Sequence, residues 1–334
     1  MSVFTRFDRE NDVVENQRTK VSSGIFSGGS GTLTAFFSSS NAGAVSASYV
    51  SVYNKATSDS TSEIQFDIGY ANLNGSGSAG NTTKLNTGGR ETAAMYRQFR
   101  NVLLAPDTSR FTFTGASSGS EDFYFVAFNR ARMREKIDPG NWELKVGTTK
   151  LIDDSGATNN PTVNEGGRVF NIVSGSLETG KGVIKTAAAS QPGGCFGSFY
   201  PDLGIILLDA SQMDASASFG TSRSPDTFDN NGAKFFQKLS DGSKFQVRRE
   251  EEINSTNFFC RVNNKRYNFS ANPTFFTGSD GAFTNATFFK DPKVYITTVG
   301  LYNDDNELLA VAKLSKPVLK SYSREAIIKV KLDF

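Results

Sequence analysis

The sequence contains no histidine, and this absence narrows the possible functions more than any other feature of its composition. Histidine is the side chain whose unperturbed pKa lies closest to neutrality. The chain by itself can therefore form no Ser-His-Asp or Cys-His catalytic group and no histidine-based zinc or iron site. Carboxylates, lysine and tyrosine could still act in catalysis. We expect a protein that is not an enzyme and that holds no metal or cofactor.

Cysteine and long apolar runs are also scarce. Two cysteines, Cys195 and Cys260, make no disulfide framework in a chain of 334 residues, so free thiols in a reducing compartment are expected. No apolar run approaches the roughly 18 residues that a membrane-spanning helix needs. Residues 1–7 lack the apolar centre of a signal peptide. These features predict a protein made in a cytosol, with no membrane partner.

The sequence also has no large excess of positive or negative charge. Lysine and arginine number 36 and aspartate and glutamate 34, which gives a formal net charge of +2. Nucleic-acid binding usually needs a strongly basic surface, so no nucleic-acid partner is expected. A charged run at residues 130–136 is typical of a solvated strand end or short helix. A nearly neutral net charge favours a surface that packs against other proteins.

Phenylalanine and tyrosine are abundant, at 29 and 10 residues, whereas Trp142 is the single tryptophan. These side chains suit the pleated surface of a strand. Short apolar runs alternate with glycine, serine and asparagine, which mark turns. The composition predicts a mainly β fold of antiparallel, sandwich-like sheets with one short helix, in two or three packed domains.

Several segments show clear periodicity. Residues 63–70 alternate apolar and polar side chains, and residues 122–128 are apolar on both faces, as in a covered central strand. Residues 91–104 predict the helix, which Pro106 ends. The Asp-Pro-Gly-Asn run at 138–141 predicts a turn. Residues 258–269 predict a hairpin whose turn is the Asn-Asn pair at 263–264.

The last forty residues predict a hairpin and a final strand. Residues 294–302 and 307–314 form the hairpin, with a turn between them, and residues 325–334 alternate again after Pro317. A strand at the chain terminus can offer its edge to a neighbour. We therefore predict a partner interface on the side chains that share one face of it: Ile328, Val330, Leu332 and Phe334.

The patterns divide the chain into four parts. The polar, glycine-rich residues 1–47 predict an extended N-terminal arm with one or two short strands. Residues 48–150 predict a β-rich domain with the helix, and residues 151–290 a second β-rich domain. Residues 291–334 predict a hairpin and terminal strand that pack on the preceding domains.

Two resemblances to catalytic motifs are weak. Residues 175–182 approach a P-loop, but Gly182 stands where the motif needs serine or threonine, and no helix pattern follows. A turn between two strands is the favoured interpretation. Paired carboxylates at 153–154 and 250–252 could serve as acid and base in glycoside hydrolysis. Their polar context favours solvated carboxylates with ordinary pKa values.

Residues 294–304, VYITTVGLYND, and 308–314, LLAVAKL, resemble a hairpin of tail, baseplate and fibre-attachment proteins of tailed bacteriophages. Residues 327–334, IIKVKLDF, are similar to the terminal strand of such proteins. Residues 200–207, YPDLGIIL, resemble a segment of virion proteins of large contractile-tailed phages, including those that infect cyanobacteria. These segments carry no catalytic residues.

The resemblance implies a virion structural protein, made in the host cytoplasm and built into a tail or baseplate. Its partners would be other virion proteins, such as baseplate, tail or fibre subunits, and it would be oligomeric in the particle. Two alternatives stay open: a neck or capsid-associated virion protein, and a receptor- or glycan-binding β-sandwich.

Overall fold

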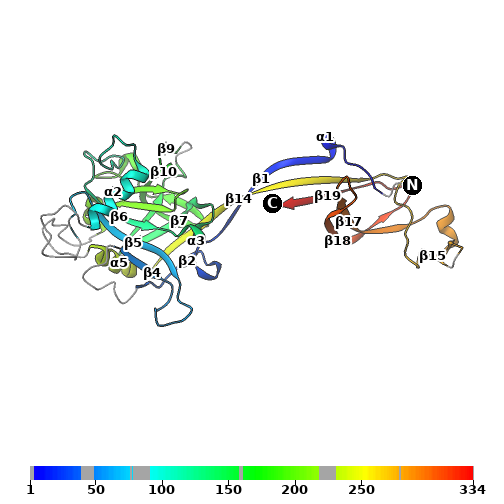
Figure 1. The fold of residues 1–334 in the computed structure, drawn as a ribbon, viewed down its shortest axis with the longest axis horizontal. Helices are drawn as coiled ribbons and strands as arrows, with labels where there is room; N and C mark the ends of the chain where they lie inside the picture. Colours follow the sequence, from blue (N-terminus) through cyan, green and yellow to red (C-terminus); the bar gives the residue numbers. More distant parts are fainter. Residues whose placement is uncertain are drawn as a thin grey trace. The chain divides into compact units, whose positions relative to one another are not determined.

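The computed structural model describes residues 4–38, 49–75, 77, 91–157, 161–217, 231–277 and 280–333. The chain forms two compact units. Unit 1 contains Met1–Thr19 and Glu252–Phe334, and unit 2 contains Lys20–Glu251. The fold is mainly β, as the composition predicts (Figure 1).

The largest sheet follows a single path of hydrogen-bonded neighbours, and each pair of known register is antiparallel. In order the path is β1 (Val13–Gly24), β14 (Phe245–Val262), β7 (Lys136–Val146), β8 (Thr149–Asp153), β10 (Gly167–Glu178), β12 (Gly197–Tyr200), β13 (Ile205–Asp209), β6 (Asp122–Ala127), β5 (Ile64–Asn72), β4 (Tyr49–Tyr53) and β3 (Phe37–Ser38). Strands that branch from this path are β2 (Thr32–Leu33), β9 (Thr162–Asn164), β11 (Lys181–Ile184) and β19 (Ala326–Asp333).

The other strands form two small sheets, β15 (Phe276–Thr277) with β16 (Ala282–Phe283) and β17 (Val294–Tyr302) with β18 (Leu308–Lys320). The α-helices among the described residues are α1 (Arg9–Asp12), α2 (Glu91–Leu103), α3 (Arg130–Met133), α4 (Ala210–Ala217) and α5 (Asn231–Gly242). Short 3-10 turns lie at Ser27–Gly29, Ala188–Ser190 and Ala286–Phe289. No helix in these parts of the chain is long and apolar enough to cross a membrane.

Unit 2 covers both faces of its central strands. On β6, Phe123 and Phe125 belong to the cluster that α2 covers with Tyr96. The alternate residue Tyr124 faces the second cluster, where its ring lies 5.2 Å from that of Phe235 on α5. The strand predicted to be covered on both faces is therefore confirmed, as is the helix over residues 91–104.

The larger cluster lies inside a curved sheet. Phe66 of β5 and Phe245 of β14 are far apart along the path of strands, yet their ring centroids are 5.2 Å apart. The sheet of unit 2 must therefore curl until these two strands face each other across the core. Helix α5 also packs closely, because a Cβ at Gly242 would overlap the carbonyl of Lys145 on β7.

The core of unit 1 is a thin layer between two sheets. The hairpin of β17 and β18 packs its inner face on the last part of β14 and on β19. Strand β19 pairs with β14 from Ser255↔Asp333 to Val262↔Ala326. The fully buried members of this layer are few: Val262, Leu301, Ile328 and Val330.

Several predictions differ from the structure. The domains predicted at residues 48–150 and 151–290 are not separate, because both contribute to one core in unit 2, and residues 252–290 of the second belong to unit 1. The hairpin predicted over residues 258–269 is wrong, because β14 ends at Val262 and takes β19 as its neighbour. Helix α5 was not predicted. In the predicted N-terminal arm, β1 is a long strand, and residues 39–47 lie outside the described ones.

Candidate functional site

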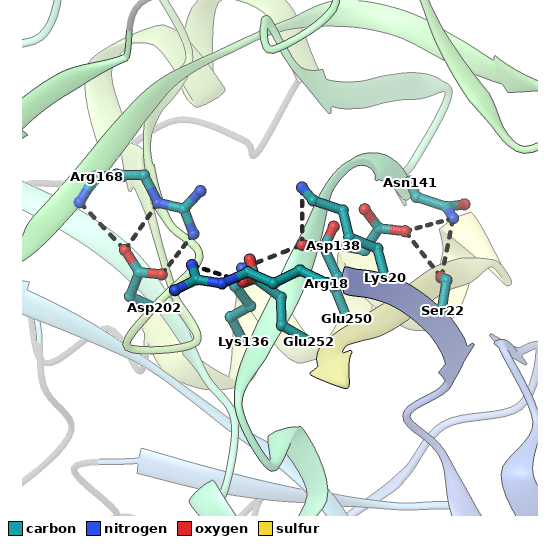
Figure 2. Close-up of polar contacts among 10 residues, drawn as sticks. All are labelled: Arg18, Lys20, Ser22, Lys136, Asp138, Asn141, Arg168, Asp202, Glu250 and Glu252. Carbon is teal, nitrogen blue, oxygen red and sulfur yellow. Dashed lines mark hydrogen bonds and ion pairs between the residues drawn. The ribbon is translucent and has the colours of Figure 1, made fainter. Parts of the chain in front are cut away.

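Charged side chains meet in unit 2 where β14 lies between β1 and β7 (Figure 2). Glu250 and Lys136 are directly paired across β14 and β7. The Lys136 Nζ and the Lys20 Nζ each lie 3.1 Å from Glu250 Oε1. The Lys136 and Glu250 side chains are only 8% and 7% exposed. Two cations from two strands thus compensate one buried carboxylate, as a buried charge requires.

A bulge in β7 adds a second carboxyl group to this cluster. The pairing register between β7 and β14 shifts between Val247 and Arg249, opposite residues 138–141. These residues were predicted to be a turn, and instead they form an outward bulge within one strand. Asp138 Oδ2 accepts hydrogen bonds from Ser22 Oγ at 2.8 Å and Asn141 Nδ2 at 2.9 Å.

The two carboxyl groups have opposite pKa shifts. Burial raises the pKa of Asp138 above its usual range, and the neighbouring Glu250 raises it further. Burial alone would also raise the pKa of Glu250, but contact with Lys136 and Lys20 holds that pKa below its usual value. The pair therefore holds a proton more readily on Asp138 than on Glu250.

The contacts of this cluster link the strands β1, β7 and β14. The Lys136–Glu250 pair is buried, so its atoms cannot reach a ligand in solution. Asp138 and Asn141 do line a surface depression of about 230 Å³, together with glycines of neighbouring turns. That volume is smaller than the roughly 300–1,000 Å³ of sites for organic ligands.

The segment YPDLG, at residues 200–204, has a structural explanation. Asp202 lies in the turn between β12 and β13, and its carboxylate accepts two side-chain hydrogen bonds from Arg168 of β10, at 2.7 and 3.2 Å (Figure 2). This bidentate contact holds the pKa of Asp202 below its usual value. Gly204 has a φ of +68° in the same turn. The segment YPDLG therefore forms a turn in unit 2, which the contact between Asp202 and Arg168 stabilises.

The P-loop resemblance is resolved as a turn between strands, as favoured from the sequence. Glu178 pairs with Lys181 across β10 and β11, and the two residues between them, Thr179 and Gly180, have φ values of +49° and +79°. Positive φ at both positions is the geometry of a tight hairpin turn. A strand follows the turn, so this loop offers no helix N-terminus to a phosphate.

The expectation of solvated carboxylates is wrong at two places. Asp153 and Asp154 are 1% and 4% exposed. Asp153 accepts hydrogen bonds from the backbone amides of Gly140 and Ser155, and burial raises its pKa. Glu250 is buried as described above. Asp153 and Asp154 bind backbone amides, whereas Glu250 binds the lysine side chains of two strands, and the sequence pattern alone did not indicate either role.

The predicted interface residues lie in two different situations. Ile328 and Val330 are buried in the core of unit 1, and Leu332 packs against the same core. Phe334 lies outside the described residues. An interface through the side chains of Ile328 and Val330 would require this core to open, so the partner role of this strand stays a prediction that rests on its edge and its outer face.

Unit 1 instead exposes a different set of apolar side chains. Most of the large apolar residues that are exposed in the described chain belong to unit 1, although it is the smaller unit. Several of them lie on the outer face of the β17–β18 hairpin, and one lies on the outer face of β19, on the opposite side of the core layer. On these strands they are Tyr295, Tyr302, Leu308, Leu309, Val311 and Ile327.

A second apolar feature of unit 1 is a cluster of phenylalanines between β14 and β17. Phe275 is 4% exposed, and its ring packs against those of Phe269, Phe283 and Phe288 at centroid distances of 5.1–5.6 Å. Phe269 and the nearby Phe289 remain 65% and 79% exposed. The sequence analysis predicted neither this phenylalanine cluster nor the exposed apolar faces of the strands. The closely spaced phenylalanines of residues 269–289 were the signal in the sequence that could have indicated the cluster.

Comparison with known proteins gives no further assignment. No protein-family model, no curated protein and no solved structure matches this chain.

Proposed function

We propose that this chain is a structural subunit of a larger protein assembly and that unit 1 makes its contacts. The class of assembly that we propose is the tail or baseplate of a tailed bacteriophage, because the hairpin of β17 and β18 and the strand β19 resemble segments of such proteins. The role is mechanical: the subunit holds its neighbours in register through large interfaces.

The observation that carries the proposal is the apolar outer surface of unit 1. Leu309 and Val311 of β18 are 68% and 59% exposed, and Tyr295 and Tyr302 of the adjoining β17 are 65% and 42% exposed. Single exposed apolar residues are common in soluble proteins. A group of them on adjoining strands is instead typical of a surface that another protein covers, because leaving it in water is unfavourable.

The charge cluster of unit 2 supports the same proposal from another direction. Its carboxylates and lysines link β1, β7 and β14, and the Lys136–Glu250 pair at its centre is buried. Buried ion pairs of this kind define one arrangement of strands. A subunit that bears mechanical load benefits from strands whose register cannot slip.

The proposal is tested on purified particles from the source of this sequence. We expect peptides of the chain in the particles, at low and fixed stoichiometry relative to the major capsid and sheath proteins, measured by quantitative mass spectrometry. High copy number would move the chain to the capsid or tail tube. Absence from the particles would overturn the proposal. Binding of the isolated chain to a glycan array would then favour a receptor-binding protein.

A further inference from the structure

The outer face of the β17–β18 hairpin is a continuous apolar surface. Gly300 lies opposite Val311, and a Cβ at Gly300 would lie 2.9 Å from the Tyr302 ring and 3.2 Å from Leu308 Cδ1. These two side chains therefore extend over the backbone of Gly300. Leu309 and Val311 are 68% and 59% exposed beside them. We call Tyr302, Leu308, Leu309 and Val311, with Gly300, the outer hairpin patch.

The two ends of this patch carry opposite charge. The turn after β17 is acidic, with Asp304, Asp305 and Glu307 all exposed. The other end is basic, with exposed Lys313 and Lys316 on β18. At the basic end of the patch, Lys313 pairs with Thr298, two residue pairs along the hairpin from the Gly300–Val311 pair. On the other side the Asn303 amide donates to the Glu307 carbonyl, at the last rung before the turn.

This arrangement complements itself under a two-fold rotation. Residues along a strand are spaced by about 3.3 Å, so Lys313 and the Asn303–Glu307 rung lie at roughly similar distances from the centre of the patch. When the face of one hairpin is laid antiparallel on an identical face, the apolar centre meets itself. The acidic turn of each copy then meets Lys313 of the other. An interface between identical surfaces related by a two-fold axis needs such complementarity.

We propose that the outer hairpin patch binds the same patch of a second copy of this chain, in an antiparallel two-fold dimer. This inference rests on the proposed function in one respect: both require another protein chain to bind the exposed surface of unit 1. The inference assigns a specific partner, a second copy of the chain, to the outer hairpin patch, whereas the proposed function assigns no partner to any one surface.

The N-terminal segment contacts Tyr302 of this patch but leaves Leu309 and Val311 exposed. The ring of Phe4 lies 4.8 Å from that of Tyr302, and Arg6 Nη2 approaches Asp304 Oδ1 at 4.0 Å. Both charged groups of that contact are more than nine-tenths exposed, so it contributes little. The exposures of Leu309 and Val311 already include any cover that residues 4–6 provide. The centre of the patch therefore remains available to a second chain.

The first experiment measures the self-association of the full-length chain by sedimentation equilibrium over a range of concentrations. We expect a monomer–dimer equilibrium. Val311→Asp, in the apolar centre, should abolish the dimer, whereas Val163→Asp, at a 71% exposed position of unit 2, should leave it unchanged. Circular dichroism and urea unfolding verify that each variant folds. A wild-type chain that stays monomeric at all concentrations would overturn the inference.

Charge reversal tests the antiparallel arrangement. Lys313→Glu places like charges at both ends of the dimer and should weaken it at least about tenfold. The double change Asp304→Lys with Asp305→Lys should do the same. Neither variant should then dimerise with itself at concentrations where the wild type does.

A mixture of the two charge variants gives the decisive result. The glutamate introduced by Lys313→Glu in one chain would meet the basic turn of the other, and the acidic turn of the first would meet the unchanged Lys313 of the second. The mixture should therefore form a heterodimer with about wild-type affinity. A parallel or unrelated interface would give no such recovery, and that outcome would overturn the two-fold arrangement. A monomeric chain that is nevertheless found in particles would overturn this inference and leave the proposed function standing.

Discussion

Strands β6 of unit 2 and β17 of unit 1 are both rich in apolar residues, yet their surroundings differ. Five of the six residues of β6 are buried, because helices and strands cover both of its faces. On β17 only Val294 and Leu301 are buried. The side chains of Tyr295 and Tyr302 on the same strand are exposed. A strand with two apolar faces needs two covers, and the described chain by itself supplies only one for β17.

The difference extends to how each unit is stabilised. Unit 2 has a large aromatic core inside its curved sheet. Unit 1 has a thin apolar layer and, close to it, a buried ammonium, since Lys320 is 0% exposed and is held by three oxygen acceptors. Unit 2 is therefore expected to be stable alone, and unit 1 to gain stability when its outer surface is covered.

The largest expected effect comes from the core of unit 2. Phe66 contacts the rings of Phe26, Phe36, Phe128 and Phe245. Phe66→Ala should lower the free energy of unfolding by about 4 kcal/mol, because it leaves a cavity in a packed core. Urea unfolding followed by the fluorescence of Trp142, which is buried in unit 2, measures this loss.

The matched control for this change lies in unit 1. Tyr295→Ala removes an aromatic side chain of similar size that is 65% exposed, and the free energy of unfolding should change by less than about 0.5 kcal/mol. Far-ultraviolet circular dichroism measures this change, since Trp142 belongs to unit 2. Equal losses in the two variants would mean that β17 is covered in the isolated chain and would remove the contrast between the units.

The second effect concerns the charge cluster of unit 2. Lys136→Met leaves Glu250 and Asp138 with a single exposed lysine, and should cost about 3 kcal/mol, because a buried charge loses its partner. Lys20→Met removes the other lysine, whose side chain is 65% exposed, and should cost about 1 kcal/mol or less. Thermal unfolding of the two variants measures both. Similar losses would show that Lys136 has no special role.

The third effect tests the buried lysine of unit 1. Lys320 Nζ donates hydrogen bonds of 2.9 Å to Asn264 O, Asn268 Oδ1 and Ser321 O. Lys320→Met leaves these oxygens without their donor and should cost about 2 kcal/mol. The exposed Lys316→Met is the control and should be nearly neutral. Far-ultraviolet circular dichroism is the appropriate signal, since Trp142 belongs to unit 2. A neutral Lys320→Met would indicate that water replaces the ammonium.

The smallest effect is the pH dependence of the two carboxyl groups in the cluster. The pKa of Glu250 is lowered from 4.5, so its contribution to stability is present above pH 4.5 and is lost as the pH falls further. The pKa of Asp138 is raised from 3.8, so its charged form is unfavourable at neutral pH, and this penalty disappears as the pH falls through the folded pKa.

Two isosteric variants separate these contributions. At pH 7, Glu250→Gln should destabilise the protein, whereas Asp138→Asn should stabilise it by less than about 1 kcal/mol. Both differences from the wild type should shrink by about pH 3. Urea unfolding between about pH 3 and pH 7 measures them. Variants that change stability in the same direction at pH 7 would contradict the opposite pKa shifts.

Local patterns were sufficient for some parts of the fold. The terminal hairpin was predicted from two apolar strands and an Asn-Asp-Asp-Asn turn, and β17 and β18 form it. Helix α2 was predicted from its apolar stripe and from Pro106, which follows its end. Helix α5 carries a similar signal in Phe235 and Leu239, four residues apart and both buried. No helix was predicted there from the sequence.

The candidate site could not be predicted in the same way. Lys136 belongs to a charged run that is typical of a solvated segment, and it is buried because Glu250, more than one hundred residues later, is paired with it. The bulge that brings Asp138 to Ser22 looks in sequence like a turn between strands. Neither contact leaves a periodic signal, because its partners lie on strands distant in the chain.

The sequence by itself determined the mainly β character, the alternation that defines the faces of several strands, and the turns at residues 179–180 and 303–306, because these depend on neighbouring residues. Only the tertiary structure decided which strands pair, as β14 with β19 in place of the local Asn-Asn turn. It also decided which apolar faces are covered: the inner face of β17 by β14 and β19, the outer face by no strand of the described chain. Burial depends on what lies opposite a residue in space, and that is fixed by contacts between distant segments.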